Sequence, residues 1–118
     1  MKLKILGTEY TVCTHRVSED DTLRKNHWDG YCDEDNKEIV IADVMDEEFF
    51  VNMDAAGREK YRKKILRHEI LHAFLNESGL SDNSAVPSEG WAKYEEMIDW
   101  FAIQFPKIRK AYKKAGCL

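Results

Sequence analysis

The sequence contains the stretch His68-Glu69-Ile70-Leu71-His72, and this H-E-x-x-H pattern constrains the fold more than any other feature. In an α-helix, which turns about 100° per residue, the two imidazoles lie one turn apart and Glu69 flanks them on the same side. Two imidazoles at this spacing suit a single tetrahedral Zn²⁺. Glu69 is placed to take a proton from a metal-bound water instead of binding the metal itself. The pattern therefore predicts a helix that carries a zinc site, with Glu69 as its catalytic residue.

A zinc site of this type needs a third protein ligand, and the sequence restricts where that ligand comes from. Leu75 and Ser78 stand where the extended H-E-x-x-H-x-x-G-x-x-H pattern requires Gly and His, so a third histidine of that kind is excluded. A carboxylate on a second helix is the alternative. Glu95 and Asp99 share a helix face, which favours Glu95 as metal ligand and Asp99 as the acceptor of an imidazole N–H. Glu96 stays an alternative ligand, because it also neighbours Asp99, at i and i+3.

Composition predicts one domain over residues 1–118. Of the 118 residues, 43% are apolar, which suffices for a modest core. No apolar run approaches the length that spans a membrane, and the N-terminus lacks the apolar region of a secretory signal. Cys13, Cys32 and Cys117 show no C-x-x-C spacing and are expected to be reduced thiols. These features predict a cytoplasmic protein.

The net charge of −4 conceals an asymmetry between the two halves of the chain. Residues 1–56 carry 6 basic and 14 acidic residues, net −8, whereas residues 57–118 carry 12 basic and 8 acidic residues, net +4. An acidic first half disfavours a nucleic-acid partner. The basic cluster at 107–114 predicts an amphipathic helix that docks its apolar face on the domain, with contact to an acidic partner as the alternative. The residues expected to dock are Ile108, Ala111 and Tyr112.

The first half of the chain has the alternation and turn residues of a small antiparallel or mixed sheet. Residues 2–13 predict one or two short strands with a turn at Gly7, and residues 18–24 form either one helical turn or a loop. A hairpin is expected between strands at 30–32 and 38–42, because the intervening residues have the composition of a hairpin loop.

The second half predicts two helices that meet at the zinc site. A long helix is expected over about 56–77, with Asp54 as its N-cap. A loop follows at 81–87. A second helix is predicted from about 88 to 105 and should stop before Pro106, because a proline disfavours helix in the residue before it. The fold class is therefore α+β and zincin-like, with the sheet packed on the H-E-x-x-H helix and a second helix that bears the third ligand.

Residues 43–54 are acidic and surround the apolar run Phe49-Phe50-Val51. Their pattern does not specify a helix or a strand. The aromatic side chains are expected to close over the core, and a lid that faces the substrate is the alternative.

His68-Glu69-x-x-His72 followed by Glu95-x-x-x-Asp99 resembles the gluzincin arrangement of zinc metallopeptidases. The fuller context, with an arginine before the first motif and Trp-Phe-Ala after the acids, is similar to small phage and prophage proteins of the ImmA/IrrE-type metallopeptidase family. The downstream pattern of that family, approximately E-x-x-A-[ND]-x-F-A, aligns with the segment that begins at Glu95. This chain has Ile98 where the family usually has Ala.

The resemblance covers roughly residues 28–105, and only the two motifs are specific. It implies a cytoplasmic zinc endopeptidase of a phage or its bacterial host, and it implies Glu95 as the third ligand. Better-studied members cleave helix-turn-helix repressors, so the resemblance implies a protein or peptide substrate such as a repressor or another regulatory protein of a mobile element. The strand at 39–42 is expected to offer its edge to an extended substrate.

Two features leave other functions open. No histidine follows His72, so the donor that would stabilise an oxyanion has to come from Tyr31, Tyr94, His27 or an arginine. A zinc-binding interaction module without catalysis is therefore the first alternative. A metal-free interaction domain, in which the two histidines only pack or form hydrogen bonds, is the second. The sequence does not specify an oligomeric state.

Overall fold

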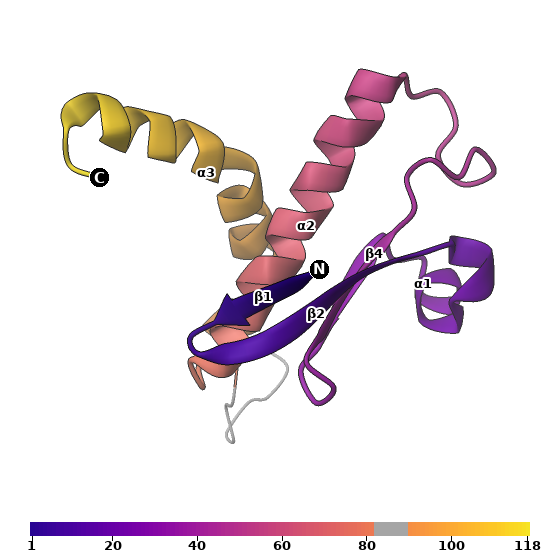
Figure 1. The fold of residues 1–118 in the computed structure, drawn as a ribbon, viewed down its shortest axis with the longest axis horizontal. Coiled ribbons are helices and arrows are strands. Elements are labelled where there is room, and N and C mark those ends of the chain that lie inside the picture. Colours follow the sequence, from indigo (N-terminus) through magenta and orange to yellow (C-terminus); the bar gives the residue numbers. More distant parts are fainter. Residues whose placement is uncertain (82–89) are drawn as a thin grey trace.

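The computed structural model describes residues 1–81 and 90–118, so the loop predicted at 81–87 lies outside the described residues apart from Ser81. Figure 1 shows a curved sheet beside one long helix, α2, from which a second long helix, α3, diverges. The strands are β1 (Lys2–Ile5), β2 (Thr8–His15), β3 (Gly30–Asp33) and β4 (Glu38–Ala42). The helices are α1 (Asp21–Asn26), α2 (Ala55–Glu77) and α3 (Glu95–Ala115), with 3-10 turns η1 (Val17–Glu19) and η2 (Trp91–Lys93).

The sheet is mixed and has the strand order β1-β2-β4-β3. β1 and β2 form an antiparallel hairpin around Leu6 and Gly7, whose φ angles are 48° and 94°. β3 and β4 form the predicted second hairpin, and the Asp33 carboxylate accepts the backbone N–H groups of Asp35 and Asn36 in its turn. β2 and β4 join the two hairpins in parallel. The α+β class, the mixed sheet and both hairpins agree with the sequence analysis.

The connection between β2 and β3 contains the short helix α1, which decides between the helical turn and the loop expected at 18–24. Asp20 caps this helix, because its side chain accepts the backbone N–H of Leu23 at 3.0 Å. The Leu23 side chain is fully buried and fixes α1 to the core. β2 extends to His15, two residues beyond the expected end of the strand region.

The long helix α2 packs on one face of the sheet and confirms the predicted helix over 56–77. Asp54 is its N-cap and accepts the backbone N–H of Gly57 at 2.7 Å. Ile65, Glu69 and Ala73 recur every four residues and are buried, so this stripe faces inward. Other large buried side chains of the core are Tyr10, Leu23, Ile39, Val40, Ile41 and Phe50. The H-E-x-x-H pattern therefore lies at the centre of the domain, on the helix that covers the sheet.

The second helix differs at both ends from the predicted range 88–105. A 3-10 turn, η2, comes first, and α3 begins at Glu95. At its other end α3 continues through Pro106. Proline has no N–H, so the carbonyl of Ala102 loses its usual helical donor. The Arg67 Nε–H donates to that carbonyl at 2.5 Å, and this long-range contact explains why the helix tolerates the proline.

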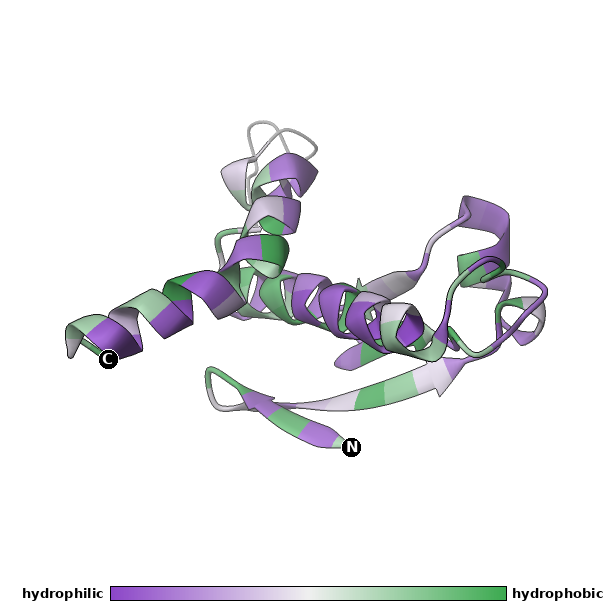
Figure 2. Cartoon of the chain, turned by 90° about the horizontal axis from the view of Figure 1, so that it is seen from above, coloured by the Kyte–Doolittle hydropathy of each residue, from purple (hydrophilic) through white to green (hydrophobic). Residues whose placement is uncertain are grey.

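The C-terminal half of α3 does not dock on the domain, so the expectation for residues 107–114 is wrong. Ile108 is half-buried, whereas Ala111 and Tyr112 are exposed. Figure 2 shows this half of α3 extending away from α2 and the sheet. Only Ile98 and Ala102 of α3 are buried, and both lie before Pro106.

Residues 43–54 form a series of turns between β4 and α2. Phe50 is buried in the core, but Phe49 and Val51 are exposed, so the expected closure over the core holds for one aromatic side chain alone. None of the described helices is long and apolar enough to cross a membrane.

Candidate metal centre

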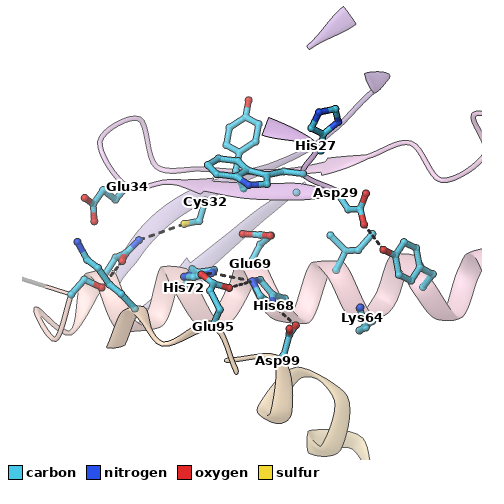
Figure 3. A pocket seen from close by; sticks show the side chains of 18 residues that line it. His27, Asp29, Cys32, Glu34, Lys64, His68, Glu69, His72, Glu95 and Asp99 are labelled. Carbon is cyan, nitrogen blue, oxygen red and sulfur yellow. Dashed lines mark hydrogen bonds and ion pairs between the residues drawn. The ribbon is translucent and has the colours of Figure 1, made fainter. Parts of the chain in front are cut away.

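α2 brings together His68, Glu69 and His72, whose potential ligand atoms all lie within 4.8 Å of one another. The Nε2 atoms of the two histidines are 3.0 Å apart and face each other across one helical turn. Figure 3 shows the two imidazoles side by side on α2, with Glu69 between them and the sheet. A group of two imidazoles and one carboxylate at this spacing can hold a metal ion.

Glu95 adds a carboxylate from the first residue of α3. Its Oε2 lies 3.1 Å from His68 Nε2, and its Oε1 lies 3.3 Å from His72 Nε2. Tetrahedral zinc with ligand bonds of about 2.0–2.1 Å places its donor atoms roughly 3.3–3.4 Å apart. The three atoms are therefore separated by nearly the edge length of a zinc tetrahedron. Figure 3 shows the Glu95 carboxylate directed at the two imidazoles from the α3 side.

Asp99 lies one turn further along α3 and contacts the other nitrogen of His68. Its Oδ1 is 3.0 Å from His68 Nδ1. A carboxylate accepts hydrogen bonds, so the proton of a neutral His68 resides on Nδ1 and its Nε2 carries a lone pair. This lone pair faces His72 Nε2 and the Glu95 carboxylate, which are also acceptors. Such a cluster needs a cation at its centre.

The ionisation of His72 favours a metal ion over a proton as that cation. Burial lowers the pKa of His72, and the neighbouring His68 adds to this effect although Glu95 opposes it. A neutral imidazole is the form that binds metal. Two imidazoles and a carboxylate form a donor set that suits zinc. The residues present therefore fit a zinc ion.

Glu69 is on the buried side of the cluster and is only 5% exposed. Burial raises its pKa to about 8, and the negative charges of Glu95 and Asp99 raise it further in the same direction. Its Oε1 would lie 3.0 Å from a Cβ atom at Gly30 of β3, so a residue without a side chain is needed there. Glu69 is thus held between α2 and β3 and is adjacent to the possible ligands.

The cluster opens into a cleft of about 790 Å³ between α2 and β3. Both histidines, Glu69, Glu95 and Asp99 line it. Further lining side chains come from β3, its preceding loop, α2 and η2, and include His27, Trp28, Asp29, Tyr31, Tyr61, Lys64 and Lys93. Residues 43–54 are not part of this lining, so the lid interpretation finds no support.

Glu96 and the two candidate tyrosines point to other partners. The Tyr94 hydroxyl donates to Glu96 Oε2 at 2.9 Å, so Glu96 contacts a tyrosine while Glu95 contacts the imidazoles. The Tyr31 hydroxyl donates to the buried Asp20 at 3.0 Å. Both hydroxyls are therefore bonded to carboxylates. His27 lies in the cleft wall opposite α2 (Figure 3).

Sequence reasoning missed two residues that position the cluster. Gly30 permits the approach of Glu69 to β3, and Arg67 fixes the turn of α3 that follows Asp99. A glycine at the start of a predicted strand was the available signal for the first. Nothing in the sequence pairs Arg67 with Ala102, because the two residues are 35 positions apart.

Comparisons with known proteins return nothing: no family model, no curated protein and no solved structure matches this chain. The likeness to ImmA/IrrE-type proteins therefore rests on the two sequence motifs alone. The case for a function depends on the geometry of the cluster itself.

Proposed function

We propose that the protein is a zinc-dependent endopeptidase with a gluzincin-type site and a zincin-like fold. His68, His72 and Glu95 are the proposed ligands, Glu69 is the general base, and Asp99 orients His68. The observation that carries the proposal is the convergence of two imidazole Nε2 atoms and one carboxylate at 3.0–3.3 Å, beside a buried glutamate in an open cleft.

Bound zinc supplies a Lewis acid that polarises a carbonyl oxygen and lowers the pKa of a coordinated water to about 7. Glu69 accepts a proton from the attacking water and later donates it to the leaving amine. A pKa raised by burial suits this exchange, since the carboxyl group must both take up and release a proton near neutral pH. Asp99 holds His68 in the tautomer that presents Nε2 to the site.

The substrate is proposed to be an extended segment of a protein, placed along the edge of the sheet. The expectation that strand 39–42 offers this edge is wrong, because β4 pairs with both β2 and β3. Within the described residues β3 is the outer strand, and Gly30, Tyr31 and Cys32 of β3 line the cleft. A substrate added to β3 would therefore run beside Glu69. A repressor or another regulatory protein of a phage or mobile element, cleaved in the cytoplasm of the host, is the substrate that the family resemblance favours.

The second candidate is a zinc-binding module that does not cleave. The hydrogen bonds of Tyr31 and Tyr94 to carboxylates favour it, because these hydroxyls are then not directed at a developing oxyanion. The same zinc ligands are proposed in both cases. The two candidates differ only in what Glu69 does.

Proteolysis by zinc-loaded protein distinguishes the two candidates, with a library of quenched fluorescent peptides as substrate. Glu69→Gln should keep the zinc and lose about 100-fold or more of the cleavage rate, because the general base is removed. Glu96→Gln is the matched control and should retain activity, since Glu96 contacts Tyr94 instead of the cluster. Full activity in Glu69→Gln would contradict the mechanism. Bound zinc without cleavage of any peptide by the wild type would favour the interaction module.

A further inference from the structure

The C-terminal half of α3, residues 105–115, is called the basic arm here. It contains five Lys or Arg residues and no Asp or Glu. Phe105, Ile108 and Tyr112 lie on one side of it at helical spacing, and Phe105 and Tyr112 are each 51% exposed. Arg109 borders this stripe. The basic arm therefore presents an apolar surface edged with positive charge, away from the rest of the described chain (Figure 2).

A second exposed surface has the opposite charge. Residues 43–54, called the acidic segment, contain five Asp or Glu residues and no Lys or Arg. Its exposed apolar side chains are Met45, Phe49, Val51 and Met53. Phe50 anchors the segment in the core, and the buried Arg58 donates through Nη1 to the Val44 carbonyl at 2.5 Å. The acidic segment is thus a fixed surface in which apolar and acidic residues alternate.

The two surfaces border the same apolar groove but do not meet within one molecule. Met53 of the acidic segment and Ile103, shortly before the basic arm, both line a groove of about 280 Å³ between α2 and α3. Lys60, Lys64 and Arg67 form its polar lining. Figures 1 and 2 both place the acidic segment and the basic arm at opposite ends of the molecule, with α2 between them.

We propose that two copies of this chain associate through these surfaces, with the basic arm of each copy lying on the acidic segment of the other. Five positive charges on the arm match five negative charges on the segment, and both carry exposed apolar side chains that a contact would cover. A twofold axis near the groove makes the contact reciprocal, so the assembly closes as a dimer. An apolar centre with a charged rim is the usual composition of such an interface. This inference is independent of the proposed peptidase activity.

Sedimentation velocity over a range of protein concentrations at low salt tests the proposal. The wild type should form a dimer that weakens at high salt, because the contact is charged at its rim. Arg109→Glu/Lys113→Glu and, separately, Glu47→Lys/Glu48→Lys should each raise the dissociation constant at least about tenfold, since like charges then oppose each other. An equimolar mixture of the two variants should dimerise again, because both reciprocal contacts become complementary.

Lys110→Glu/Lys114→Glu is the matched control, since it makes the same charge change on the opposite side of the basic arm from the apolar stripe. It should weaken the dimer much less than Arg109→Glu/Lys113→Glu. Circular dichroism and zinc content report whether each variant is folded. A monomeric wild type at every concentration would overturn the proposal, also if the arm then bound anionic lipid vesicles. Failure of the mixture to dimerise, or equal effects of the two arm variants, would overturn it as well.

Discussion

At the scale of single residues, the position of Glu69 depends on a glycine in the facing strand. A Cβ atom at Gly30 would lie 2.9 Å from the Ile65 side chain and 3.0 Å from both Glu69 Oε1 and the Val40 carbonyl. The Val40 carbonyl belongs to the backbone of β4 and cannot yield as a flexible side chain can. β3 and α2 are therefore as close at this point as a residue without a side chain allows.

Gly30→Ala should separate β3 from α2 and displace Glu69. We expect a loss of about 1–3 kcal/mol in the free energy of unfolding, as for other overpacked sites. The cleavage rate should fall by about 10-fold to 100-fold, because a small displacement of the base impairs catalysis, while the zinc content stays at the wild-type level. Urea unfolding, peptide cleavage and metal analysis measure the three effects. An unchanged cleavage rate would show that Gly30 does not position Glu69.

A second cluster at the residue scale fixes the C-terminal end of α2 to the sheet. Glu77 accepts hydrogen bonds from Thr8, Tyr10 and Lys37 at 2.6–2.8 Å. The bond from Lys37 is the largest cause that lowers the pKa of Glu77, from its ordinary value of 4.5 to about 2, and the two hydroxyls add to it.

Because the pKa of Glu77 is lower in the folded state, the ionised carboxylate stabilises the fold above about pH 4.5. This stabilisation should be lost progressively as the pH falls from about 4.5 to 2. Glu77→Gln should be less stable than the wild type at pH 7, and the difference should shrink over that range. Urea unfolding at a series of pH values measures it. A difference that stays constant from pH 7 to pH 2 would contradict this role of Glu77.

At the scale of elements, the metal cluster depends on how α3 is held against α2, because the possible ligands come from both helices. The contact from Arg67 to the Ala102 carbonyl is the bond that compensates for Pro106. Arg67 directly precedes the H-E-x-x-H pattern, and Ala102 lies one turn after Asp99 in α3. One hydrogen bond thus links the two motifs.

A double-mutant cycle tests this link. Arg67→Met should cost about 1–3 kcal/mol of stability, because it leaves the Ala102 carbonyl without a donor. In a Pro106→Ala background the helix supplies its own N–H, so the same substitution should cost clearly less. Thermal and urea unfolding of the four proteins give the coupling free energy. Equal costs in both backgrounds would mean that Arg67 stabilises the protein in some other way.

The elements also show how far the sequence alone leads. Local signals suffice for α2, because Asp54 caps it and the apolar periodicity is long, and for the two hairpins, because their turns have turn residues. They fail at Pro106, where a distant arginine replaces the missing donor. The parallel pairing of β2 with β4 is also a contact between distant segments. In the cluster, helical spacing brings Glu95 and Asp99 to one face, but only the packing of α3 on α2 separates Glu95 from Glu96.

At the scale of the whole molecule, a metal ion would join α2, which packs on the sheet, to α3, which contacts the core through Ile98 and Ala102. Binding to the folded state alone stabilises it by about 2.7 kcal/mol at a free zinc concentration 100 times the Kd. Removal of zinc by a chelator should therefore lower the Tm by about 10 °C for a chain of this size. Calorimetry with and without chelator measures the shift. Glu95→Ala should show no such shift, and a chelator effect of equal size in that variant would contradict the joining role of Glu95.

The central claim is that His68, His72 and Glu95 hold one zinc ion. Metal content by mass spectrometry, on protein purified without chelator, tests it most directly. We predict one zinc per chain in the wild type and in Glu96→Ala, and none in Glu95→Ala. A wild type that contains no zinc, even after zinc is added back, would contradict the account and leave a metal-free interaction domain as the better interpretation.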